Sequence, residues 1–113
     1  MAGKFELKTA VNGQVMFNLK DGNGELILTS KLYAAKSSAL NGIGSVKNNS
    51  SSDANFERKK SAKGDFSFVL KARNGHSIGK SEMYSSEAAM ENGIKSVMKN
   101  GGTDKVDDIT QKA

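Results

Sequence analysis

The sequence predicts an α+β fold in which two tandem β-β-β-α(-β) repeats share one mainly antiparallel sheet. Both helices are expected on one face, with a pseudo-twofold axis between the repeats. Displacing the chain by 51 residues aligns 5–50 with 56–101 without a gap and leaves 18 of 46 positions identical. Within each copy, the hydrophobic period changes from two to that of a helix. One copy alone offers a marginal core, so the two must fold together.

Three strands are expected at the start of each copy. Phe5–Thr9 alternates as a half-buried strand, and the next strand directs Val15, Phe17 and Leu19 to one face. An Asn-Gly pair, at 23–24 and again at 74–75, predicts the hairpin turn into a third strand. The inward residues of the second copy are Phe66, Phe68 and Leu70, and the third strands carry Ile27 and Ile78.

A helix follows in each copy. Its apolar positions recur at helical spacing, as Ala35, Ala39, Ile43 and Val46, matched by Ser86, Met90, Ile94 and Val97. Ser85 or Ser86 is a plausible N-cap, with Glu87 in the first turn. Asn41-Gly42 and Asn92-Gly93 fall in mid-helix, where Gly costs about 1 kcal/mol relative to Ala. Close packing of the helix explains that choice more simply than a ligand does.

The connections favour a single domain over residues 1–113, made of repeat 1 (5–50) and repeat 2 (56–101). The polar linker at 48–53 is too short to separate two independent domains. Residues 106–109 are predicted to form a last strand, because they fall opposite 55–58 in the repeat register. Residues 110–113 are expected to be a disordered tail.

The repeated residues resemble the YegP-like family of small bacterial proteins, which contain one or two copies of a domain of unknown function. The pattern begins Phe-x-Leu-Lys-x-x-Asn-Gly-x-x-Ile-x-x-Ser-x-x-Tyr and continues Asn-Gly-Ile-x-Ser-Val. It runs over 17–33 with 41–46, and again over 68–84 with 92–97. The resemblance implies units that assemble into one sheet, with last strands that can be exchanged between units. It implies no activity. The second copy departs from the first at Arg58 (for Leu7) and Gly79 (for Leu28).

Enzymatic chemistry receives little support from the composition. There is no cysteine, and His76, the single histidine, follows a turn, where an exposed residue is a simpler interpretation than a base or metal ligand. No pair of carboxylates has a spacing typical of acid/base catalysis. We therefore expect no enzyme, cofactor, metal or catalytic residue. The chain shows neither a signal peptide nor an apolar run of membrane-spanning length, so a cytoplasmic protein without membrane contact is expected.

Two surfaces are candidates for binding. The first is the sheet face opposite the helices, where Met16, Leu26 and Leu28 are expected to form an apolar patch for a protein partner or for self-association. Their counterparts Ser67, Ser77 and Gly79 are small and polar. Burial of the strand on both sides, or a face assignment wrong by one residue, would remove this patch.

The second candidate is a basic cluster, in a chain of net charge +5, that permits weak binding of nucleic acid or another polyanion. Strand alternation sends Arg58 and Lys60 to one face and Lys59 to the other, so the cluster is not a continuous stripe. Aromatic residues are scarce around it, and a solvated strand end is the simpler interpretation. The cluster comprises Arg58, Lys59, Lys60, Lys63, Lys71 and Arg73. The sequence leaves the function itself unknown, with a binding module on the open sheet face as the first hypothesis and polyanion binding as the alternative.

Overall fold

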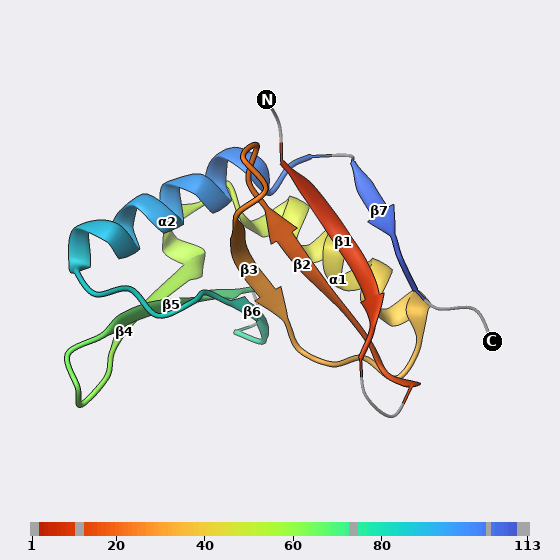
Figure 1. Cartoon of the computed structure of the whole chain (residues 1–113), viewed down its shortest axis with the longest axis horizontal. Coiled ribbons are helices and arrows are strands. Elements are labelled where there is room, and N and C mark those ends of the chain that lie inside the picture. The colour runs from red at the N-terminus through yellow and green to blue at the C-terminus, as the bar shows by residue number, and fades with distance from the viewer. Residues whose placement is uncertain (1–2, 11–12, 73–74, 104, 111–113) are drawn as a thin grey trace.

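The computed structural model describes residues 3–10, 13–72, 75–103 and 105–110. Three strands and a helix are followed by a short 3₁₀ turn, and the same order then recurs with a final strand (Figure 1). The elements are β1 (Lys4–Thr9), β2 (Val15–Lys20), β3 (Leu26–Ser30), α1 (Lys36–Asn49), η2 (Asp53–Asn55), β4 (Phe56–Lys60), β5 (Phe66–Lys71), β6 (Ser77–Lys80), α2 (Glu87–Asn100) and β7 (Val106–Asp108).

All seven strands form one sheet in the order β4-β5-β6-β3-β2-β1-β7. Every pair is antiparallel except β1 and β7, which run parallel. The predicted α+β class, with two repeats in one mainly antiparallel sheet, is confirmed. The repeats join at β3 and β6, where Thr29 lies opposite its own counterpart, Lys80. The place where a residue meets its own counterpart is called the axis below.

The pairing of the strands shows that one face of the sheet continues from repeat 1 into repeat 2. Leu19 lies opposite Leu28 on this face, Ser30 opposite Gly79, and Gly79 opposite Leu70. Directly opposed residues point to the same side of a sheet. α1 packs against β2, and α2 packs against β5, on the side of these buried residues. The opposite side of the sheet, which faces the viewer at β1 and β2 in Figure 1, is covered by no described helix there and is called the open face below.

Two contacts at the axis explain where the repeats diverge. A Cβ on Gly79 would lie 2.9 Å from the Thr29 carbonyl oxygen and 3.1 Å from Cγ of Leu28, its counterpart. A Cβ on Gly101 would likewise meet the side chain of its counterpart Ser50, which is buried. Two equal side chains cannot occupy one place on an axis. One repeat therefore carries the side chain, and the other carries glycine.

Each helix packs on a tyrosine from the loop before it. A Cβ on Gly42 would lie 2.8 Å from Cζ of Tyr33, and one on Gly93 would lie 2.8 Å from Cζ of Tyr84. Each tyrosine stacks on the phenylalanine of its own repeat, with centroids 6.2 and 6.3 Å apart. The mid-helix glycines are thus required by a ring at the helix surface, as close packing predicts. Ser86 caps α2 by accepting a hydrogen bond from the Ala89 N–H at 3.1 Å.

The last strand belongs to repeat 2 by sequence and lies beside repeat 1 in space. β7 forms at the predicted position, where the Phe5 N–H donates to the Lys105 carbonyl (2.9 Å) and the Ile109 N–H donates to the Leu7 carbonyl (2.8 Å). Thr110, expected to begin the disordered tail, donates from its N–H to Asp108 at 3.1 Å. Residues 111–113 lie outside the described residues.

Candidate functional site

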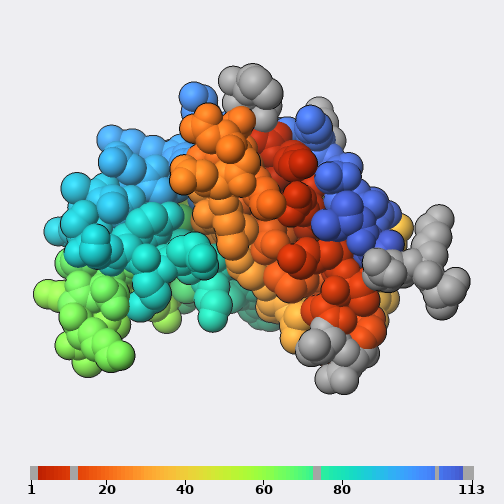
Figure 2. Space-filling view, viewed as in Figure 1, coloured from red at the N-terminus to blue at the C-terminus, as the bar shows by residue number. Residues whose placement is uncertain are grey.

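The open face is rich in lysine. Side chains on alternate residues of β1, β2, β5 and β6 point to this side, as does Lys59 of β4, and the lysines contributed by the two repeats nearly match. Three carboxylates accompany six lysines, which leaves this face with a net positive charge. The lysines are Lys4, Lys8, Lys20, Lys59, Lys71 and Lys80, and the acids are Glu6, Glu57 and Asp107. Figure 2 shows the part of this face that β1, β2, β3 and β7 form.

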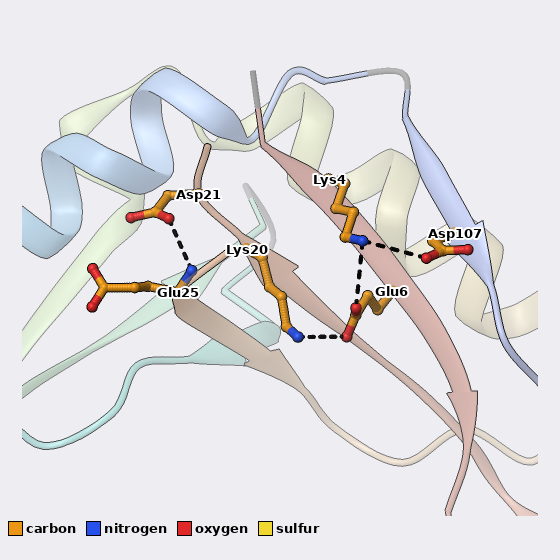
Figure 3. Close-up of polar contacts among 6 residues, drawn as sticks. All are labelled: Lys4, Glu6, Lys20, Asp21, Glu25 and Asp107. Carbon is orange, nitrogen blue, oxygen red and sulfur yellow. Dashed lines mark hydrogen bonds and ion pairs between the residues drawn. The ribbon is translucent and has the colours of Figure 1, made fainter. Parts of the chain in front are cut away.

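Equivalent ion pairs lie on both halves of the open face. In repeat 1, Lys20 lies 3.0 Å from Glu6, and Lys4 lies 3.7 Å from the same carboxylate (Figure 3). In repeat 2, the counterparts Lys71 and Glu57 lie 2.7 Å apart. The hydrogen bond from Lys71 lowers the pKa of the Glu57 carboxyl, so this group is ionised at neutral pH. These ion pairs neutralise part of the positive charge of the open face and restrain the lysines that form them.

Three lysines of the open face are not held in an ion pair, although Lys59 lies close enough to Glu57 to help lower the pKa of that carboxyl. In the part of the chain that the structure describes, Lys8, Lys59 and Lys80 form no ion pair. Lys8 and Lys59 are counterparts in the two repeats, and Lys80 lies at the seam between them. Their charges spread over both halves of the sheet, so an extended anion could contact all three.

A shallow hollow of about 360 Å³ lies on the open face at the seam between the repeats. Thr29 and Val69 flank Lys80 in the strand register, and Leu32, which is 46% exposed, lines the hollow with them. The hollow gives the seam a concave surface next to an uncompensated cation. It has the mixed polar and apolar character of a contact surface rather than that of an enclosed catalytic pocket.

The apolar patch expected on this face is wrong in one of its three residues. Leu28 is 1% exposed and faces the helices, whereas Met16 and Leu26 are half-buried on the open face. A bulge in the ladder between β2 and β3 is the cause, since Leu19 pairs with Leu28 but the next residue, Lys20, pairs with Leu26. Both Ile27 and Leu28 are therefore buried. The remaining two apolar side chains lie among lysines.

The basic cluster is divided by the strand register. Arg58 lies on the helix side, where its guanidinium binds Glu91 at 2.5 Å and Asp53 at 2.8 Å. These bonds raise the pKa of Arg58 and lower that of Glu91, so both groups stay charged and mutually engaged. Lys60 lies over the Phe66 ring at 5.6 Å on that same side.

The other members of the cluster fall elsewhere. Lys59 and Lys71 lie on the open face, and Lys63 is exposed in the turn between β4 and β5. Arg73 lies outside the described residues. The structure therefore does not bring the cluster together as one surface, and its two open-face members join lysines of repeat 1.

Sequence reasoning missed those repeat 1 lysines, although the chain contains a signal for them. Lys8 matches Lys59, and Lys20 matches Lys71, at positions that strand alternation directs outward in both copies. Identity at outward positions is not explained by a shared core. Combining the repeat alignment with the strand alternation would have found the open-face lysines.

A separate polar cleft lies between α1 and the residues that precede β6. It has a volume of about 240 Å³, and Tyr33, Asn41, Ser45 and His76 contribute to its lining. His76 is exposed on this turn. Within the described residues, no group of three or more His, Cys, Asp or Glu side chains is arranged to hold a metal ion. None of the described helices is long and apolar enough to span a membrane.

A family model, curated proteins and solved structures are all similar to this chain. A family model described as a domain of unknown function, DUF1508, matches residues 10–57 and again 61–108. The chain is 53% identical to the YegP protein of Yersinia pestis over 108 residues, 96% of each chain. It is similar to the solution NMR structure of yegP from E. coli, a protein of unknown function (TM-score 0.94, 47% identity, 100% of this chain and 97% of that one). A UPF0339 protein of Shewanella oneidensis gives a TM-score of 0.92 at 51% identity, with 97% and 93% covered.

Proposed function

Because this chain belongs to the DUF1508 family, whose description assigns no function, its role must come from its own surface, and we propose that it is a non-enzymatic module that binds a polyanion on its open face. The polyanion is a nucleic acid, bound through its phosphate backbone. Such a partner is present in the cytoplasm, the compartment that the sequence predicts. The observation that supports this proposal is the matched set of lysines on a sheet face that no described helix covers.

The arrangement suits weak binding without sequence preference. Phosphate contacts depend on charge and position, whereas base recognition needs groups that reach base edges or rings on which bases stack. The phenylalanines of both repeats lie in the core or on the helix side. Lysines on opposite halves of one sheet can contact successive phosphates of an extended strand. Binding of this kind releases counterions and weakens as salt is added.

A non-enzymatic role is supported by the same surface. The ionisable groups of the open face are lysines and carboxylates that pair with each other, and two of the three acids are held by Lys20 and Lys71. Catalysis requires an acid, base or nucleophile poised in a pocket. The hollow at the seam is shallow and its ionisable residues are lysines, so it fits contact better than chemistry.

Fluorescence anisotropy of short labelled DNA and RNA, single- and double-stranded, tests the proposal. With about three phosphate contacts, the affinity should fall roughly tenfold or more between about 50 and 200 mM salt. The variant Lys59→Glu/Lys80→Glu reverses two charges of the open face that are not held in ion pairs, and it should weaken binding at least tenfold at low salt. The matched control is Lys95→Glu/Lys99→Glu, which makes the same change in net charge on exposed positions of α2.

The control distinguishes a binding face from general attraction to a basic protein. A reduction of less than about threefold for the α2 variant supports binding on the open face. Equal reductions for the two variants would assign the effect to net charge, and the proposal would fail. Absence of binding by the wild type at low salt would also reject it.

A further inference from the structure

The two outer edges of the sheet are equivalent in the repeat but differ in what covers them. β7 covers the edge of β1 through the bonds made by Phe5 and Leu7. β4 is the counterpart of β1 and ends the sheet on the other side, with no strand beyond it among the described residues. The Phe56 N–H is taken by the Asp53 carbonyl. The open part of this edge therefore begins at Arg58, whose backbone points outward as that of Leu7 does.

A groove of about 340 Å³ runs beside the open edge, between β4 and α2. Its lining includes Arg58 and Glu87, the counterparts of Leu7 and Lys36. In repeat 1 those two residues hold the end of β7, because Leu7 lies opposite Asp108 and Lys36 forms an ion pair with Asp108. The groove thus occupies in repeat 2 the place that β7 fills in repeat 1.

The charge of this groove defines the kind of strand that fits it. Three cations and one carboxylate line it, but Arg58 is already engaged by Glu91 and Asp53. The charges left for a partner are those of Lys59 and Lys60, which form no ion pair in the described part of the chain. A row of cations on an edge repels the same edge of a second copy and disfavours pairing with other basic strands. An incoming strand that carries carboxylates removes this repulsion. The chain's own β7, with Asp107 and Asp108, is a strand of that type.

We propose that the β4 edge and the adjoining groove bind an acidic, extended segment of another protein. The segment adds to the sheet parallel to β4, as β7 adds to β1. Outward backbone groups of Arg58 and Lys60 supply the ladder bonds, which are indifferent to sequence. Carboxylates set against Lys59 and Lys60 supply the preference for acidic sequences.

A second copy of the chain is a poorer occupant than a different protein. The β7 strand of each copy is already held on β1 by backbone bonds and by ion pairs of Lys4 with Asp107 and of Lys36 with Asp108. Its release would expose the β1 edge beside Phe5 and Leu7, which are fully buried. An intramolecular strand also competes at a high effective concentration. The acidic segment must therefore come from elsewhere.

Amide chemical shifts of the full chain, titrated with a capped peptide of the sequence Lys-Val-Asp-Asp-Ile-Thr (residues 105–110), test this inference. The shifts should concentrate at the Arg58 and Lys60 amides and at Glu87. A peptide with Asn in place of both Asp residues should bind at least fivefold more weakly. Lys60→Pro removes one outward N–H and should abolish binding, whereas Lys60→Ala keeps the N–H, loses one charge and should weaken binding only about two- to threefold.

Other outcomes overturn the proposal. Shifts confined to Phe5 and Leu7 would mean that the peptide replaces β7, and concentration-dependent dimerisation would make a second copy the occupant. Equal binding of the Asp and Asn peptides would remove the acidic preference, which decides the matter even if Lys60→Pro does not fold. Lys60 and the peptide take no part in the open-face experiment, so failure of either proposal leaves the other standing.

Discussion

Repeat 1 and repeat 2 share a core plan but differ along the axis that joins them and at the outer edges of their sheet. On the axis, Leu28 faces Gly79 and Ser50 faces Gly101, each pair being counterparts. At the edges, β7 covers β1, whereas no strand of the described residues covers β4. A duplicated chain cannot remain symmetric where a side chain meets its own counterpart at close range. Tyr33 and Tyr84 stay identical, and both lie in loops away from the axis and from the outer edges.

Exchanging Leu28 and Gly79, the pair at the axis, gives the largest expected effect on the free energy of unfolding. Gly79→Leu should lower the free energy of unfolding by about 3 kcal/mol, because its side chain would enter the space of Leu28, and Leu28→Gly should lower it by about 4 kcal/mol through an empty space in the core. The double variant restores one leucine at the axis. In urea unfolding, its free energy of unfolding should be at least about 2 kcal/mol higher than the sum of the two single losses predicts. Simple additivity would mean that the two positions do not share one space.

Alanine at the helix glycines tests whether the two halves pack alike. Gly42→Ala should destabilise the fold by about 2 kcal/mol, because the new methyl group meets Tyr33 and lies 2.9 Å from Cε2 of the buried Phe17. Gly44→Ala, in the same helix, meets nothing within 4 Å and should stabilise by up to about 1 kcal/mol. Thermal unfolding measures both. Gly93→Ala should follow Gly42→Ala, with a slightly smaller loss because Phe68 lies further away, at 3.2 Å.

Hydrogen exchange compares the two edges directly. The Leu7 N–H faces β7 in the parallel ladder, whereas the Arg58 N–H, its counterpart, faces an open edge. Exchange at Leu7 should therefore be slower by about ten- to a hundredfold. Removal of residues 106–113 should bring the exchange rate of Leu7 close to that of Arg58. Equal protection in the intact chain would show that something covers β4 as well.

The ion pair that fastens β7 gives the smallest effect, and it depends on pH. Hydrogen bonds from Lys36 and Thr110 lower the pKa of the Asp108 carboxyl below its usual value. A lowered pKa in the folded state gives stability that is present above the unfolded pKa, near 4, and is lost as the pH falls through the folded value. Asp108→Asn should therefore weaken the fold slightly at neutral pH, and this difference should shrink steadily as the pH falls below about 4. A constant difference at all pH values would exclude the carboxylate as the cause.

The sequence alone predicts the repeat, both helices, the hairpins and the position of β7, because each has a local pattern or a matching copy. The sequence alone does not predict the face of the sheet on which Leu28 lies. Leu26, Ile27 and Leu28 are apolar in succession, so alternation does not assign their sides, and the bulge is defined only by pairing with β2. The engagement of Arg58 by Glu91 also depends on residues distant in sequence. Such contacts arise from the assembled sheet and have no local signal.

The most direct test of the proposed function is a map of the residues that respond to a short single-stranded oligonucleotide in amide chemical shift titrations at low salt. The proposal predicts shifts on outward positions of both repeats, above all at Lys8, Lys59 and Lys80, that disappear as salt is added. Shifts gathered on α1 and α2, with the open face silent, would contradict it and move the binding surface to the helices.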